Sequence, residues 1–145
     1  MELNGEVNSH NLPFISAELA GFPFVLRMLI DTAYAGGIQI TDYTTAVARG
    51  SELRHIGGPV SFTLADGIHQ VSCRLFKTRL LYKGEAHDVI VYIPYVFPKM
   101  SEESRIRTVE RDGNALLGSS FLRVCRLEIE YPEKTVSIRR QTWAI

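Results

Sequence analysis

Apolar and polar residues alternate with a period of two along much of this chain of 145 residues. Successive side chains of a β-strand point to opposite faces, so this pattern predicts strands with one buried face. The pattern is clear near the end of the chain, where glutamates separate Leu127, Ile129 and Tyr131. We therefore expect an all-β protein built from many short strands.

Turn-forming residues divide the predicted strands into hairpins. Gly21-Phe22-Pro23 separates a strand at 14–19 from Phe24–Ile30, and Pro132-Glu133-Lys134 separates the last two strands. Asp66-Gly67, the strongest short hairpin signal, lies between 60–65 and 68–77. Lys83-Gly84 joins 78–82 to 86–93 in a further predicted hairpin.

One or two short helices are expected among these strands. Thr41 or Asp42 can cap a helix over 43–49, which Gly50 would end, and 119–124 is a second candidate. Residues 1–12 are expected to form a polar N-terminal arm, and 94–114 a long polar loop with room for one helical turn. No linker or internal repeat divides the chain, so 1–145 is expected to be a single domain.

The charge balance restricts the partners. Sixteen basic and sixteen acidic residues give a formal net charge of zero, which supplies no general attraction to nucleic acid or to an anionic membrane. No basic-then-apolar signal opens the chain, and no apolar run reaches membrane-spanning length. Cys73 and Cys125 lie far apart. We therefore expect a cytoplasmic protein with two reduced thiols and no nucleic-acid or membrane partner.

The predicted strand Phe24–Ile30 ends abruptly at Asp31, before Thr32, Ala33 and a glycine-rich turn. A carboxylate at the end of a buried strand costs free energy unless hydrogen bonds or a function compensate it. Asp31 could simply bind the amides of its own turn, a common arrangement at strand ends. The alternative is that it performs chemistry.

Residues 29–33 (Leu-Ile-Asp-Thr-Ala) form one motif, and 115–122 hold a later apolar-apolar-Gly element followed by a predicted short helix. Together the two segments resemble the retropepsin-type aspartic proteases, most closely the small prokaryotic predicted aspartyl proteases. The first matches the apolar-apolar-Asp-Thr/Ser-Gly motif of that family, and the second matches its later apolar-apolar-Gly element and short helix. The Asp66-Gly67 hairpin falls where the family carries its flap. The resemblance spans about 13–140 and implies the closed, barrel-like acid protease (retropepsin) fold.

The resemblance implies an aspartic endopeptidase that acts as a homodimer on a peptide or protein substrate. Each subunit would contribute one Asp31 to a dyad, because the chain holds a single acid motif. Thr32 would bond across the dimer, and Ala33 completes the catalytic loop. The expected substrate-binding residues follow that loop or form the flap: Tyr34, Ala35, Gly36, Leu64, Ala65, Asp66, Gly67 and Ile68. Such chemistry needs no cofactor or metal, and the four histidines do not fall at metal-ligand spacing.

Two residues depart from a simple family pattern. Ala33 stands where the family usually has glycine, which is tolerable at negative φ and strained at positive φ. Tyr34 could line the cleft or block it. A retropepsin-fold module that binds an extended peptide or partner protein without cutting it is therefore an alternative, and a plain β-barrel with a coincidental Asp-Thr-Ala is a third. Trp143 is expected at the subunit interface.

Overall fold

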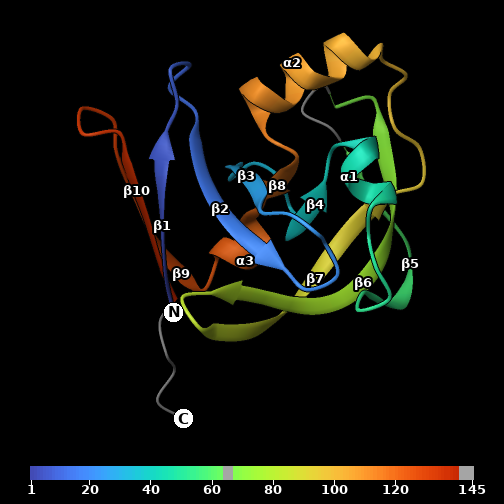
Figure 1. Ribbon diagram of the computed structural model, residues 1–145, viewed down its shortest axis with the longest axis horizontal. Helices are drawn as coiled ribbons and strands as arrows, with labels where there is room; N and C mark the ends of the chain where they lie inside the picture. The colour runs from blue at the N-terminus through green and yellow to red at the C-terminus, as the bar shows by residue number, and fades with distance from the viewer. Residues whose placement is uncertain (64–66, 141–145) are drawn as a thin grey trace.

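The computed structural model describes residues 1–63 and 67–140. Its strands form one mixed sheet, with a short α1 after β4, α2 before β8 and a short α3 after it (Figure 1). The expected Trp143 contact lies outside the described residues. In chain order the elements are β1 (Glu2–Val7), β2 (Pro13–Leu19), β3 (Leu26–Ile30), β4 (Ile38–Ile40), α1 (Tyr43–Val47), β5 (Arg54–Thr63), β6 (Gln70–Tyr82), β7 (Glu85–Pro94), α2 (Glu102–Asp112), β8 (Ala115–Leu117), α3 (Ser119–Leu122), β9 (Cys125–Glu130) and β10 (Thr135–Arg140).

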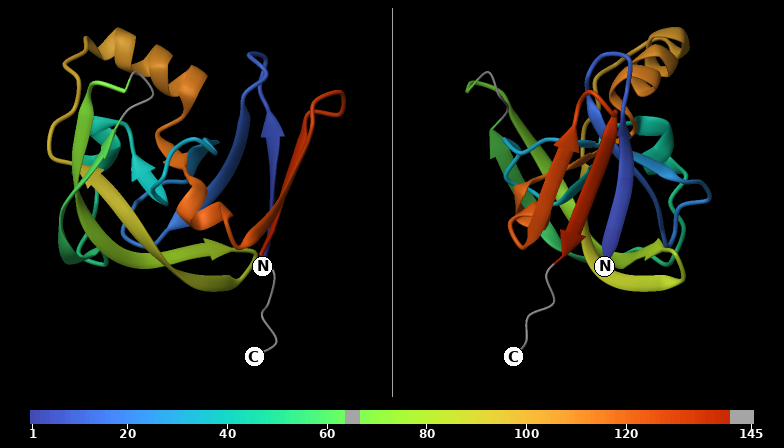
Figure 2. Two further views of the ribbon diagram at one scale, coloured as in Figure 1. Left: turned by 180° about the vertical axis from the view of Figure 1, so that it is seen from behind. Right: turned by 90° about the vertical axis from the view of Figure 1, so that its left-hand side faces the viewer.

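Six of the strands close into a barrel. The sheet order is β5-β6-β7-β4-β8-β3-β2-β1-β10-β9, and an additional pairing of β6 with β2 joins the ring β2-β3-β8-β4-β7-β6. The long β6 makes this closure possible, because it bends around the barrel and pairs in turn with β5, β7 and β2 (Figure 2). The sequence-based expectation of a mostly β, barrel-like protein is thus confirmed.

One apolar core joins the barrel to the strands outside it. Buried residues from β2, β3, β4, β7 and β8 belong to the same cluster as Leu3 of β1 and Ile138 of β10. Strand β2 belongs to this cluster. Its side chains alternate between buried and exposed over its second half, as expected for a strand with one face on the core. The predicted hairpins β2–β3, β5–β6, β6–β7 and β9–β10 are all present as antiparallel pairs.

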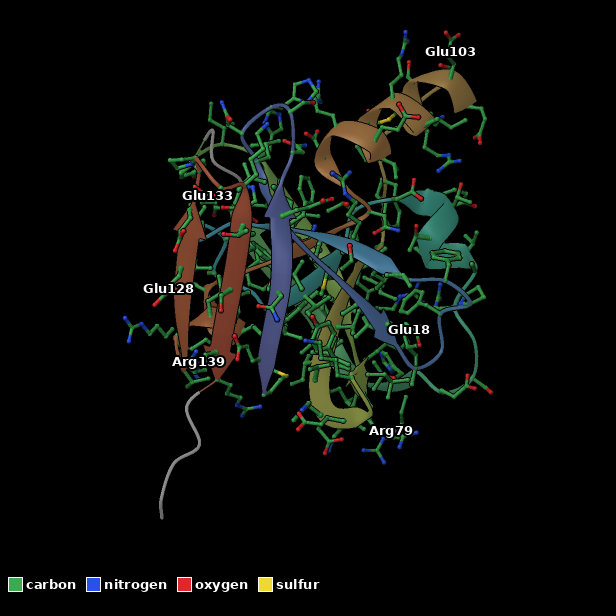
Figure 3. All side chains as sticks on the ribbon, turned by 60° about the vertical axis from the view of Figure 1, so that its left-hand side comes forward. Glu18, Arg79, Glu103, Glu128, Glu133 and Arg139 are labelled. Atoms are coloured by element: carbon green, nitrogen blue, oxygen red, sulfur yellow. The ribbon has the colours of Figure 1, made fainter. Side chains whose placement is uncertain are left out.

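The outer strands β1, β10 and β9 continue the sheet beyond β2. Charged side chains such as Glu128 and Arg139 point away from the barrel there (Figure 3). Arg139 lies 3.9 Å from Glu2, and Arg126 lies 2.9 Å from Glu128. Charges on an edge strand such as β9 disfavour pairing with a strand of another chain.

The expected polar N-terminal arm, 1–12, is wrong for half of its length. Residues 2–7 form β1, which pairs with both β2 and β10. Leu3 and Val7 are buried while Glu2, Asn4 and Glu6 are exposed, so this short segment has the same period of two as the other strands.

The polar segment 94–114 is also not a loop with a single helical turn, because it holds the eleven-residue α2. The Ser101 hydroxyl caps this helix by accepting a hydrogen bond from the amide of Ser104, at 3.1 Å. Glu102 and Glu103 lie in its first turn, where negative charge favours the helix dipole. Gly113 ends the helix at φ +76°, and any side chain there would collide with the carbonyl of Arg27.

A partly buried ion pair ties α2 to the rest of the chain. Asp42, the N-cap of α1, accepts hydrogen bonds from the amide and hydroxyl of Thr45, at 3.0 and 2.8 Å. Both of its carboxylate oxygens also lie 3.2 Å from Arg105 of α2. No residue of α2 is itself buried. Figure 1 shows the helix lying across one end of the barrel, where Arg105 helps to hold it.

Candidate functional site

Asp31 lies directly after β3, beside the end of β8. The two strands run parallel, with Ile30 opposite Leu117, and the amide of Asp31 donates to the carbonyl of Leu117 at 3.0 Å. Ile30 and Leu117 are buried, whereas the Asp31 side chain is half-buried. The barrel core therefore fixes the backbone up to the carboxyl group and leaves the group itself within reach of solvent.

The loop after Asp31 is ordered by its own hydrogen bonds. The amide of Ala33 donates to Oδ1 of Asp31 at 3.1 Å, and the amide of Tyr34 donates to the carbonyl of Asp31 at 3.2 Å. Thr32, Ala33 and Ala35 are exposed. The loop thus presents a half-buried carboxyl group and an exposed threonine on the surface of the subunit.

Alanine at position 33 causes no backbone strain. Apart from glycines, the described residues with positive φ are Asn11, Lys83 and Lys134, so Ala33 lies outside the region that favours glycine. The departure from the Gly of the family motif therefore does not distort the loop.

The two motif segments, 29–33 and 115–122, meet in space. The amide of Gly118 donates to the carbonyl of Gly37 at 2.8 Å. The next two amides do the same: that of Ser119 donates to the carbonyl of Tyr34 at 2.8 Å, and that of Ser120 to the carbonyl of Gly36 at 3.1 Å. These three hydrogen bonds connect the start of α3 to the loop that follows Asp31. The residues that carried the resemblance are therefore neighbours, although more than eighty positions separate them in the chain.

Position 118 requires glycine because there is no room for a side chain, and not because of its dihedral angles. Its φ is −104°, which any residue can adopt. A Cβ at this position would collide with the carbonyl oxygen of Gly36 and lie 2.8 Å from that of Tyr34. Only a residue without a side chain lets the two loops approach closely enough for their hydrogen bonds.

The hairpin of β5 and β6 corresponds to the expected flap. Its strands pair up to Thr63 opposite Gln70 and extend to one side of the barrel (Figure 2). Gly67 has φ +72°, and Ile68 is 80% exposed. The other three expected flap residues, Leu64, Ala65 and Asp66, lie outside the described residues. The hairpin is confirmed, and its role as a flap stays a prediction.

Tyr34 connects the Asp31 loop to this hairpin. Its ring meets that of Phe62 of β5 edge to face, with centroids 5.1 Å apart, and Phe62 meets Tyr92 of β7 in the same way at 5.3 Å. Burial raises the pKa of Tyr34 well above its usual range, with smaller contributions from Cys73, Tyr92 and Asp31. The phenol is therefore neutral and unsuited to act as a base.

The cysteines offer no nucleophile. Cys73 is fully buried, and this burial raises the pKa of its thiol to about 11. The thiol of Cys125 donates to the carbonyl of Phe121 at 3.5 Å, and burial raises its pKa as well. A catalytic cysteine needs the opposite shift.

The largest cavity described lies away from Asp31. It has a volume of about 930 Å³ and is bordered by α2, by the segment 95–100 and by the start of α1. Tyr43, Tyr95, Val96 and Phe97 line it, and the Asp42–Arg105 ion pair lies at its wall. No local sequence pattern predicts this cavity, because most of its wall comes from α2 and the segment before it, which the sequence analysis expected to be a loop. Asp31 lines neither this cavity nor the two smaller ones described.

Across residues 1–63 and 67–140, no three His, Cys, Asp or Glu side chains gather in a way that could hold a metal ion. No helix in the same residues is both long and apolar enough to cross a membrane. Comparisons of the chain with protein-family models, with curated proteins and with solved structures find no match.

Proposed function

We propose that this protein is an aspartic endopeptidase that is active as a homodimer, with one Asp31 from each subunit forming the catalytic dyad. The observation that carries the proposal is the junction of the two motif segments. A half-buried Asp31 ends a core strand, and three backbone hydrogen bonds from the Gly118–Ser120 segment hold the loop that follows it. A plain scaffold would instead have a buried Asp31 with a single hydrogen bond and no cleft above it. The half-buried side chain departs from the first of these three features, whereas the single hydrogen bond that it accepts within the described residues, from Ala33, agrees with the second.

The chemistry requires two carboxyl groups. Two such groups held close together share one proton, because ionising both is costly. The ionised Asp31 would take a proton from a water molecule, which attacks the peptide carbonyl. The protonated Asp31 would donate to the carbonyl oxygen, and a proton would then pass to the leaving amine.

One subunit offers only one suitable acid. The chain holds a single acid motif, and the hydrogen bond that the Asp31 carboxylate accepts comes from the amide of Ala33 in its own loop. Thr32 and Ala33 are exposed, which leaves them free to contact a second copy of the loop across the proposed two-fold axis. The proposed site is therefore incomplete in the monomer, which agrees with the position of Asp31 outside the three cavities described.

Activity should depend on protein concentration. The mass in solution is expected to be twice the 16.3 kDa of the chain at high concentration. Specific activity on a mixed peptide library should fall on dilution, over the same range in which sedimentation shows dissociation. Constant specific activity in a solution shown to contain only monomer would contradict a site shared between subunits.

The alternative is a module that binds an extended peptide or a partner protein without cutting it. The observation that favours it is the aromatic-lined cavity beside α2, which Asp31 does not reach. A peptide bound only there would not meet the proposed dyad. Protection of Tyr95 and Tyr43 from solvent by a bound peptide that stays intact would support this alternative.

A further inference from the structure

We propose that Tyr34 limits the size of the side chain that a bound peptide can place next to Asp31, so that the site prefers glycine or alanine there. The inference rests on the proposed function for the location of the peptide. It concerns binding, however, and so it can be tested even if no peptide is cut.

The ring of Tyr34 is packed onto two glycines of the site. A Cβ on Gly36 would collide with the phenol end of the ring, and one on Gly118 would lie 2.5 Å from Cδ2. The ring therefore lies against the backbone at positions 36 and 118. These are the segments that hydrogen-bond to each other beside the Asp31 loop.

The other side of the ring faces the flap. Phe62 contacts it edge to face at a centroid distance of 5.1 Å, with the ring planes at 67°. Phe62 is itself supported by Tyr92. The Tyr34 ring thus fills the space between the floor of the site, formed by the two glycines, and the strand that leads to the flap.

An extended peptide would have to share this space. Successive side chains of an extended chain point to opposite sides, so one of those flanking the reacting bond faces the floor and the other faces the flap. Tyr34 is three residues from Asp31, and its amide donates to the carbonyl of Asp31. The peptide side chain that faces the floor next to Asp31 would therefore meet the Tyr34 ring. A large side chain at this position would have to displace the ring.

Packing alone holds the ring in place. The hydroxyl of Tyr34 is buried and has no hydrogen-bond partner among the described residues. The ring, rather than the hydroxyl, is therefore the feature that limits size. Phenylalanine at this position should preserve the limit, and a small residue should remove it.

The test uses two peptide analogues in which a hydroxyl group replaces the carbonyl of the bond to be cut. The analogues differ only in the side chain that precedes this hydroxyl, which is methyl in one and benzyl in the other. Calorimetry would measure their binding to wild type, Tyr34→Phe and Tyr34→Ala. Wild type and Tyr34→Phe should bind the methyl analogue about tenfold tighter or more, and Tyr34→Ala should favour the benzyl analogue. If thermal unfolding shows that the alanine variant is not folded, Tyr34→Val replaces it as the small-residue variant, because valine keeps more of the packing and is still much smaller than tyrosine.

The outcomes separate this inference from the proposed function. The same preference in wild type and in the small-residue variant would overturn the inference, even if wild type cuts peptides. A preference that shifts as expected, in a protein that cuts none, would support the inference and contradict the endopeptidase. Failure of wild type to bind either analogue at millimolar concentration would overturn the inference.

Discussion

Replacing Asp31 by asparagine is expected to abolish detectable peptide cleavage, with a loss of about 10⁴-fold, because neither step of the proton transfer can proceed without the carboxyl groups. The fold should survive. An asparagine side-chain oxygen can still accept the hydrogen bond that the amide of Ala33 donates at 3.1 Å. Initial rates on a cleaved peptide, together with sedimentation and thermal unfolding of the variant, would measure both effects.

The matched control is Asp88→Asn, which makes the same chemical change at an exposed residue of β7. Asp88 lies 3.7 Å from Lys77, and its side chain is 70% exposed. This variant should cleave peptides at the wild-type rate. Proteolysis retained in Asp31→Asn would remove Asp31 from the mechanism.

Mixing subunits extends this test to the shared site. If wild type and Asp31→Asn exchange freely in equal amounts, about one quarter of the dimers hold two intact subunits. Activity per dimer should then fall to about that fraction. An activity that stays at one half, as independent subunits would give, would show that each subunit carries a complete site.

Gly118→Ala is expected to lower the free energy of unfolding by about 3 kcal/mol, at the upper end of the usual cost of overpacking. The added methyl group meets backbone carbonyls of Gly36 and Tyr34, which cannot move aside as a flexible side chain could. The Asp31 loop and α3 would have to separate, which breaks the hydrogen bonds between them. Urea denaturation would measure the loss, and activity should fall with it.

Gly57→Ala is the appropriate control for that substitution. Gly57 lies in β5, its φ is not positive, and an added Cβ would have no neighbour within 4 Å. The free energy of unfolding of the Gly57→Ala variant should differ from that of wild type by less than about 0.5 kcal/mol. Equal midpoints for the two variants would show that the close approach at Gly118 does not stabilise the site.

The hairpins could be predicted from the sequence because their signals are local. A period of two on both sides of Asp66-Gly67 or Lys83-Gly84 specifies two strands and the turn between them. The cap of α1 is equally local, and Asp42 does cap it. The neighbourhood of Asp31 and Gly118 was different. It could be expected only from the family resemblance, because the parallel pairing of β3 with β8 joins residues far apart in the chain.

The errors have physical causes. Strand β1 was not predicted because it is short and has many polar residues. Leu3 and Val7 nevertheless lie four positions apart, on the same face of the strand. Helix α2 buries no residue, so it lacks the apolar stripe by which helices are usually recognised, and only its Ser101 cap and Gly113 stop remained as signals. The packing of Tyr34 against Phe62 depends on how the flap strand folds over the loop, which no local pattern encodes.

A crystal structure of the dimer would test the central claim most directly, through the distance between the two Asp31 carboxyl groups. We expect the nearest oxygens to lie about 3 Å apart across a two-fold axis, within hydrogen-bond distance of each other. Carboxyl groups separated by much more than that distance, or a protein that stays monomeric at crystallisation concentrations, would contradict the proposed dyad.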